Sequence, residues 1–195
     1  IRKISNGMIS TVAGKHGYPG YQNSPDPLAA LFNTPVGLAV NSSNSIFISD
    51  HRNHSIRNLA PIGFVTPSCG DPQLPGYANG SGAAAHFNYP GRMLMLDDNT
   101  FAIVDSANNR IRKATIKGDV TLLAGTGNAG STNGDVTTAS FNVPSGMVLL
   151  DTKTLLIADA GNAKIRSINL VSGEVKDYAG YGKSGFFNGS IEKAM

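Results

Sequence analysis

The chain is 195 residues long, with 15% charged and 41% hydrophobic residues, so it can bury the core of one large domain or two small ones. This composition excludes a disordered, highly charged tail. No apolar run approaches the roughly 18 residues of a membrane-spanning helix, and we expect no membrane insertion. The formal net charge of +3 is too small to indicate strong nucleic-acid binding on charge alone.

Turn residues dominate the rest of the composition. The 23 glycines separate short β-branched runs, a pattern typical of an all-β fold. The single cysteine, Cys69, excludes a disulfide within the chain. Cys69 stands where equivalent stretches have Ala13, Ala124 and Ala179. We therefore interpret it as a small buried strand residue and not as a reactive thiol.

A repeat of about 55 residues organises the chain. A Phe-Asn-x-Pro motif begins at Phe32, Phe87 and Phe141, which are 55 and 54 residues apart. Further anchors follow in fixed register. They are the pairs Asp50/Asn53, Asp105/Asn108 and Asp159/Asn162, the Ile-Arg steps at Ile1, Ile56, Ile111 and Ile165, and a small residue before Gly14, Gly70, Gly125 and Gly180.

Each unit predicts four short strands. Strand a follows the Pro over 37–40, 93–96 and 147–150, and its continuous apolar character predicts burial on both faces. Strand b is expected over 45–49, 101–104 and 155–158, strand c begins at each Ile-Arg, and strand d ends in the small-Gly pair. Hairpin turns between c and d are expected at Asn6-Gly7, Ile62-Gly63, Lys117-Gly118-Asp119 and Ser172-Gly173.

Four antiparallel strands repeated radially predict a β-propeller with about three and a half blades. The expected divisions are a partial blade over 1–31, blades over about 32–86 and 87–140, and a last blade with its crossover over 141–195. A helix-free solenoid is the alternative. Because propellers have about four to eight blades, we expect the missing blades to come from the same longer chain or from a second copy.

These motifs resemble the NHL repeat, and the third unit matches it best, at Phe141, Asp159, Asn162, Ile165, Arg166 and Gly180. The resemblance implies a propeller scaffold. Family members include extracellular adhesion and receptor ectodomains, single-stranded RNA-binding regulators and a metal-dependent lyase, so the scaffold implies no single function. Two departures stand out. The family's linker Asp-Gly reads Asn79-Gly80, Asn133-Gly134 and Asn188-Gly189, with Pro25-Asp26 in the first unit, and Arg92 replaces the Gly37 and Gly146 of the other units.

The periodic polar residues favour structural roles. The Asp and Asn pairs at the end of strand b are expected to stabilise turns, and Arg57, Arg112 and Arg166 to form ion pairs within or between blades. The histidines His16, His51, His54 and His86 break the period. His51-x-x-His54 has the residue type of a metal site but no matching partner pair, so we interpret these side chains as exposed loop histidines. We predict no catalytic residue, no metal site and no cofactor.

The remaining candidates lie on one face of the propeller, because b–c turns and d–a crossovers share a face in an up-and-down blade. The candidate binding residues there are Arg52, Arg110, Lys164, Tyr18, Tyr21, Tyr77, Phe186 and Phe187. Aromatic residues beside Arg are typical of protein-binding hot spots, although these aromatics also suit a role in sealing adjacent blades. Arg92 is a candidate in the central channel, either for an anionic ligand or for pairing with Asp97 or Asp98.

The sequence therefore predicts a non-enzymatic binding module whose loop face contacts another protein, in an extracellular or surface assembly. Four glycosylation sequons, at Asn41, Asn53, Asn79 and Asn188, permit secretion without establishing it. One alternative is a metal-dependent lyase or hydrolase with its site in the channel. Another is single-stranded RNA binding on the basic and aromatic face.

Overall fold

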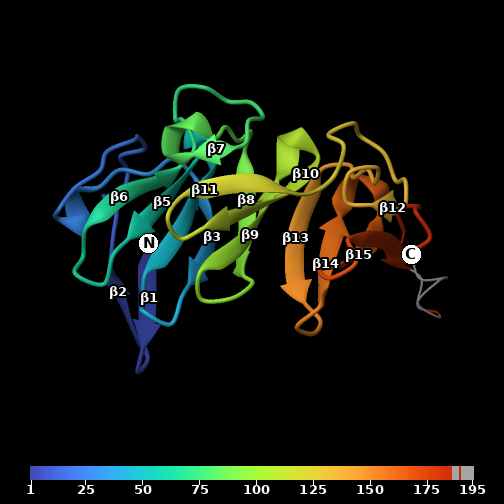
Figure 1. Cartoon of the computed structure of the whole chain (residues 1–195). Helices are drawn as coiled ribbons and strands as arrows, with labels where there is room; N and C mark the ends of the chain where they lie inside the picture. The colour runs from blue at the N-terminus through green and yellow to red at the C-terminus, as the bar shows by residue number, and fades with distance from the viewer. Residues whose placement is uncertain (186–188, 190–195) are drawn as a thin grey trace.

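The computed structural model describes residues 1–185 and 189 (Figure 1). The chain opens with a two-stranded sheet of β1 (Arg2–Ser5) and β2 (Met8–Thr11). A four-stranded sheet follows, in the order β3 (Pro35–Val40), β4 (Ile46–Asp50), β5 (Ser55–Leu59), β6 (Val65–Cys69). The next sheet has the order β7 (Gly80–Ser81), β11 (Asp119–Ala124), β10 (Arg110–Thr115), β9 (Thr100–Asp105), β8 (Pro90–Met95). The last has the order β12 (Gly134–Asp135), β16 (Glu174–Ala179), β15 (Lys164–Asn169), β14 (Thr154–Asp159), β13 (Pro144–Leu149).

These sheets are the blades of a β-propeller, as the repeat predicted. Figure 1 shows the three complete blades in chain order, with β3–β6 at the left, β8–β11 in the middle and β13–β16 at the right. The a strands β3, β8 and β13 are neighbours, so the blades meet along their inner edges. The helical segments are 3₁₀ turns: η1 (Pro27–Ala29), η2 (His51–Asn53), η3 (Gly82–Ala84), η4 (Ser106–Asn108), η5 (Ala160–Asn162). In the part of the chain that the structure describes, no helix has the length and apolar character to cross a bilayer.

The prediction that strand a is buried on both faces is wrong for part of the chain. Leu38 and Val40 in β3 and Val148 in β13 are about half exposed. Side chains along a strand point alternately to its two faces, and these face away from the neighbouring complete blades. The apolar pattern of strand a is the same in every unit. Whether its side chains are exposed therefore depends on whether a complete blade packs against that face of the sheet, and not on the type of residue.

The crossovers add an element that the repeat did not predict. Gly80 and Ser81 form a fifth strand that pairs with the start of strand d in the next sheet, with Gly80 opposite Val120. In the sheet of the first complete blade, Ser24 of the crossover before it forms the equivalent β-bridge with Val65 at the start of β6. Asn23, the residue before Ser24, is thus the equivalent of Asn79, which corrects the assignment of that place to Pro25-Asp26. Each crossover consequently ties one blade to the outer edge of the next.

Apolar clusters between adjacent sheets form the core. Ala39 and Phe47 of one sheet pack with Met93 and Phe101 of the next, and the rings of Phe47 and Phe101 stack with centroids 4.7 Å apart. Cys69 is buried in this cluster, and burial raises the pKa of its thiol to about 12. The thiol is therefore protonated at neutral pH and unreactive, which agrees with its interpretation as a small strand residue.

Candidate loop-face binding site

The b–c turns and the d–a crossovers lie together at one end of the blades, as the topology required. The side-chain amide of Asn53, in η2, donates to the carbonyl of Gly20 on the crossover at 2.8 Å. Asn108 donates in the same way to Gly76, and Asn162 to Gly130. We call this end, made by residues 15–24, 51–54, 71–79, 106–110, 126–133 and 160–164, the loop face.

A buried polar cluster fixes each part of the loop face to its blade. In the first complete blade, Asp50 accepts hydrogen bonds from Asn53 at 2.8 Å and from the backbone N–H of Asn33 at 2.6 Å, and forms an ion pair with Arg57 at 3.0 Å. The side chains of both Asp50 and Arg57 are fully buried. The structural role predicted for these residues is confirmed, but Asp50 joins three segments instead of stabilising one turn. Burial raises the pKa of Asp50 and of Asp105, against the opposing effect of their hydrogen bonds and ion pairs.

The arginine of each cluster completes its hydrogen bonds on the crossover. Arg57 donates to the side-chain oxygen of Asn23 and to the carbonyls of Gln22 and Leu31. The equivalent arginines use the linker residues that depart from the family pattern, Asn79 and Asn133. A neutral asparagine suits this place because each arginine already has a buried aspartate as its ion-pair partner. These bonds hold the crossover backbone in position and give the loop face a rigid base.

The predicted aromatic residues fall into two groups. Tyr21 lies on the guanidinium of Arg57 at 4.2 Å, and Tyr77 lies 3.7 Å from Arg110 and 4.6 Å from Arg112. Both rings are therefore part of the packing around the buried arginines, in line with the sealing role. Tyr18 is 59% exposed, and the ammonium group of Lys15 lies over its ring at 4.3 Å from the centroid. Phe186 and Phe187 lie outside the described residues.

The predicted basic residues also differ from one another. Arg110 donates to the carbonyls of Thr126 and Asn108, which holds it against the crossover. Lys164 forms an ion pair with Asp177 at 2.7 Å. The side chain of Arg52 is exposed and has no hydrogen-bond or ion-pair partner within residues 1–185. Of the three, Arg52 presents its charge most openly to a partner.

Sequence reasoning missed a cluster of His51, His54 and Tyr89. The ring of Tyr89 lies 5.1 Å from that of His51 and 4.7 Å from that of His54. Tyr89 is 42% exposed and occupies the variable position of Phe-Asn-x-Pro, between two constant residues. The only signal in the sequence was that an aromatic residue stands there in one unit, where the others have Thr34 and Val143.

The hydrogen bonds of the two histidines require opposite roles of Nδ1, which is an acceptor in His54 and a donor in His51. His54 Nδ1 accepts the backbone N–H of Tyr89 at 3.2 Å, so the neutral ring carries its proton on Nε2. His51 Nδ1 lies 3.1 Å from the carbonyl of Pro90, which requires a proton on Nδ1. Within the described residues, no three His, Cys, Asp or Glu side chains come together in the way that a metal site needs. The pair is instead arranged as a polar, aromatic surface cluster.

Arg92 lies on β8 with its side chain exposed and, among the described residues, with no carboxylate within ion-pair distance. Asp97 and Asp98, the partners that the sequence offered, form hydrogen bonds with other residues. Asp97 accepts the N–H groups of Asn99 and Thr100, and Asp98 accepts that of Ser42. The structure therefore does not form the pairing that the sequence offered, and Arg92 keeps an unneutralised charge.

Charge is unevenly divided between the two ends of the blades. The loop face carries Lys15, Arg52 and the histidine cluster, whereas Asp50 and its equivalents are buried and Asp177 pairs with Lys164 and Arg166. The opposite end carries more exposed acidic than basic residues at its a–b and c–d turns: the acidic ones are Asp97, Asp98, Asp119, Asp151 and Glu174, and the basic ones are Lys117 and Lys153. The crossovers carry the acidic residues Asp26, Asp71 and Asp135, of which only Asp71 lies within the loop face as defined above; its carboxylate accepts the N–H of Gln73. The loop face is therefore the more basic end.

A comparison with known families identifies the repeating unit. The model of the NHL repeat matches residues 32–57, which run from Phe32, the first residue of the Phe-Asn-x-Pro motif, through β3 and β4 to the buried Arg57. The chain contains an NHL repeat. The other two units place the same residue types at the same sheet positions, so the NHL-like arrangement extends over the complete blades.

Among curated proteins, Protein SUPPRESSOR OF QUENCHING 1, chloroplastic, of Arabidopsis thaliana is 31% identical over 176 residues. The alignment covers 85% of this chain and 17% of that protein. The chain thus spans less than a fifth of this relative.

Solved structures agree on the fold. An auxiliary nutrient binding protein from Bacteroides thetaiotaomicron superposes with a TM-score of 0.66 at 14% identity, over 90% of this chain and 47% of its own. The virginiamycin B lyase of Staphylococcus aureus superposes with a TM-score of 0.53 at 19% identity, over 91% of this chain and 47% of its own. At such identities the likeness establishes the fold and leaves function open.

Proposed function

We propose that this NHL-repeat propeller segment is a protein-binding module whose loop face takes a partner with an acidic surface. The observation that carries the proposal is the uneven charge. Exposed carboxylates gather at the a–b and c–d turns, whereas the loop face carries Lys15 and Arg52. Lys15 lies over the ring of Tyr18, and Arg52 belongs to the same turn as His51 and His54, whose rings lie against Tyr89. Partly exposed aromatics beside cations are the side chains that contribute most to protein interfaces.

The base beneath these residues supports the same role. Each crossover is held by a buried arginine, and each b–c turn by an asparagine bonded to both the crossover and a buried aspartate. A rigid scaffold loses little conformational entropy when it binds, so exposed groups at fixed positions contribute more to affinity. A complementary charge on the partner also speeds association.

The test uses a short fluorescein-labelled peptide rich in Glu, Asp and Tyr, with binding followed by fluorescence anisotropy. The double variant Lys15→Glu/Arg52→Glu is expected to weaken binding roughly tenfold at low salt, because both loop-face cations become repulsive. The matched control is Lys117→Glu/Lys153→Glu, which makes the same charge change at exposed sites on the opposite end. It is expected to change the affinity little.

Two outcomes would contradict the proposal. One is an equal loss of affinity in both double variants, which would show that binding depends on the net charge of the chain and not on the loop face. The other is tight, steeply salt-dependent binding of a labelled oligouridylate in place of the peptide, which would favour single-stranded RNA.

A further inference from the structure

The complete blades meet at two junctions on the loop face, which share a backbone contact and differ in their side chains. At the first junction, formed by 51–54 and 89–90, His54 Nδ1 accepts the backbone N–H of Tyr89 at 3.2 Å. At the second, formed by 106–109 and 143–144, Asn109 accepts that of Val143 at 2.8 Å. Two further side chains of the first junction have small, neutral equivalents at the second: Ser106 for His51 and Ala107 for Arg52. The imidazoles, the guanidinium and the phenol of the first junction are therefore not required to join two blades.

The ring of His51 is fixed with one nitrogen toward the next blade. Its Nδ1 lies 3.1 Å from the carbonyl of Pro90 and carries a proton, and the ring centroid lies 5.1 Å from that of Tyr89. Nε2 stands at the opposite edge of the imidazole, and it has no hydrogen-bond partner among the residues that the structure describes. In the neutral ring this nitrogen presents a lone pair, which repels a carboxylate. A proton on Nε2 turns it into a charged donor without breaking the bond to Pro90.

His54 has the opposite arrangement. Because its Nδ1 accepts the N–H of Tyr89, the neutral ring already offers an N–H donor at Nε2. A second proton would have to go onto Nδ1 and would break the bond to Tyr89. Burial, and secondarily the charge of His51, lower the pKa of His54, which also opposes a second proton. Of the two histidines, His51 is therefore the one that can gain a proton without losing a hydrogen bond.

The turn of His51 and the strand that faces it supply no free carboxylate. On the turn, Arg52 is exposed, and the preceding Asp50 is buried in its ion pair with Arg57. Segments 88–91 and 106–109 of the next blade contain no charged residue, and the next charge along β8 is Arg92.

The adjacent crossovers do not neutralise this charge. The crossover before the blade carries Lys15 and His16, and the crossover after it carries Asp71. The carboxylate of Asp71 accepts the N–H of Gln73, and in the described part of the chain it forms no ion pair with a histidine. The first junction thus keeps an excess of positive charge, and it favours an anion supplied from outside.

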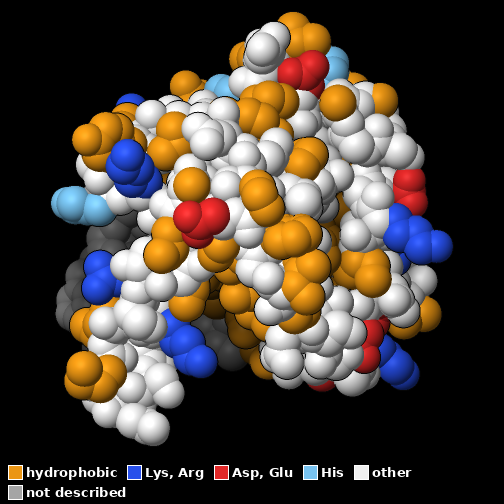
Figure 2. Space-filling view, turned by 90° about the vertical axis from the view of Figure 1, so that its left-hand side faces the viewer, with side chains coloured by type: hydrophobic (Ala, Val, Ile, Leu, Met, Phe, Trp, Pro, Cys, Tyr) orange, Lys and Arg blue, Asp and Glu red, His pale blue; other side chains and the backbone are white. Residues whose placement is uncertain are grey.

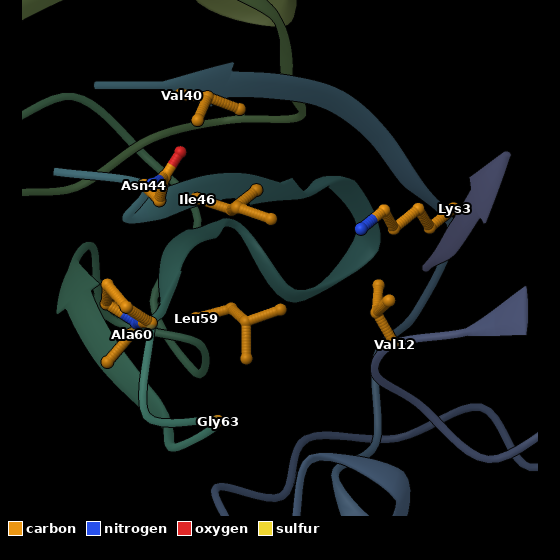
Figure 3. Close-up of a pocket in the computed structure, with 9 residues that line it drawn as sticks. Lys3, Val12, Val40, Asn44, Ile46, Leu59, Ala60 and Gly63 are labelled. Carbon is orange, nitrogen blue, oxygen red and sulfur yellow. The ribbon is translucent and has the colours of Figure 1, made fainter. Parts of the chain in front are cut away.

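An apolar cavity elsewhere in the molecule suits a carboxylate less well. The β1–β2 and β8–β9 turns lie at the bottom of Figure 1, so the loop face is the upper end. Figure 2 shows histidine side chains in its upper half and hydrophobic side chains around a hollow below them. A cavity of about 630 Å³ has Lys3 and Val12 on one side and Val40, Ile46 and Leu59 on the other (Figure 3). One ammonium group among mainly aliphatic side chains does little to offset the loss of water around a carboxylate.

On the basis of the proposed function, we infer that the first junction binds a carboxylate of the partner protein and that His51 takes up a proton from solvent as the carboxylate binds. Arg52 supplies a permanent positive charge, His54 donates from Nε2, and His51 donates from its newly protonated Nε2. Side-chain carboxylates have ordinary pKa values of about 4, so near neutral pH the proton goes to His51 and not to the partner. Because the bound state favours protonated His51, the affinity rises as the pH falls.

The test follows the acidic peptide of the proposed function between pH 8 and pH 5.5, with a rhodamine label whose emission does not depend on pH in this range. We expect about tenfold tighter binding at pH 5.5, because a neutral acceptor becomes a charged donor. Calorimetric titration in two buffers of different ionisation enthalpy should show proton uptake by the complex near pH 7. In His51→Gln, which cannot titrate, the affinity should change less than about twofold over the same range, and the proton uptake should disappear.

The matched control is His16→Gln, which removes an exposed histidine of the loop face that belongs to neither junction. This variant is expected to keep both the rise in affinity and the proton uptake of the parent chain. Urea unfolding checks that both variants fold.

Three outcomes would overturn the carboxylate site at His51. The first is a rise in affinity that persists in His51→Gln, and the second is an equal loss of this rise in His16→Gln. The third is pH-independent binding to the parent chain that Lys15→Glu/Arg52→Glu still weakens, which would leave the proposed function standing. If the peptide bound at no pH, the proposed function itself would fail and this site with it.

Discussion

The two faces of strand a show how much a neighbouring blade contributes to the fold. Met93, on β8, faces the preceding blade and is 7% exposed, whereas Leu38, at the same register on β3, is 49% exposed. On the other face, Ala39 is 5% exposed and the equivalent Val148 is 54% exposed. The residue types are alike in all four positions. Burial is therefore decided by contacts between blades and not by the hydrophobicity of a single repeat.

This difference matters for stability because one blade cannot bury both faces of its own sheet. Apolar surface removed from water contributes about 25 cal/mol per Å², and here that removal occurs between sheets. The stability of such an array is approximately the sum of each unit and its interfaces with its neighbours. Changes at a closed interface should then cost much more than the same changes at an open face.

The largest expected effect comes from the buried arginines. Arg112→Met leaves Asp105 without its ion pair and removes the donors to Asn79 and to two backbone carbonyls. A buried charge without its partner costs about 3–5 kcal/mol, so we expect a loss of this size in the free energy of unfolding, measured with urea. The matched variant Arg2→Met, at the exposed equivalent, should change it by no more than about 0.5 kcal/mol.

Similar losses of unfolding free energy in these two variants would contradict the comparison between buried and exposed positions. The arginine would then stabilise the chain within its own strand and not through its bonds to the buried aspartate and the crossover. The slope of the urea transition is the control. A change in slope would show that the variant alters the extent of folding and not only its stability.

The same pairs show what the sequence could and could not predict. Arg112 and Asp105 recur in register, so their pairing was predictable from spacing alone. The bond from Arg112 to Asn79 was not, since it depends on how a crossover 33 residues away lies against the blade. Periodicity reports residue types, whereas long-range partners depend on the path of the chain between them. The cluster of Tyr89 with two histidines was missed for this reason, because it forms between adjacent blades.

A smaller contrast is expected in the apolar residues. Met93→Ala removes a side chain packed between two blades, and such changes cost about 2–5 kcal/mol when the cavity does not collapse. Leu38→Ala, at the same register on the open face, is expected to cost less than about 1 kcal/mol. Thermal unfolding of both variants beside the parent chain measures the difference. If Leu38→Ala proved as costly as Met93→Ala, the half-exposed side of β3 would have to be covered in solution.

The smallest effect concerns the dependence of stability on pH at the loop-face end of a closed interface. His54 accepts the N–H of Tyr89 from the next blade, and Asn109 accepts that of Val143 in the same way at 2.8 Å. Burial, and secondarily the charge of His51, lower the pKa of His54. The unfolded chain then binds a proton near pH 6.5 that the folded chain resists, so this contribution to stability is present above that pH and is lost as the pH falls below it.

His54→Asn keeps an acceptor for the Tyr89 N–H and removes the titration, so stability between pH 7.5 and pH 5 should decline less than in the parent chain. The converse variant, Asn109→His, places a histidine at the matched site and should make the decline steeper. Urea unfolding at a series of pH values measures both slopes. An unchanged slope in His54→Asn would show that the bond to Tyr89 does not restrain protonation, and that this interface is held by its apolar contacts and its buried ion pairs alone.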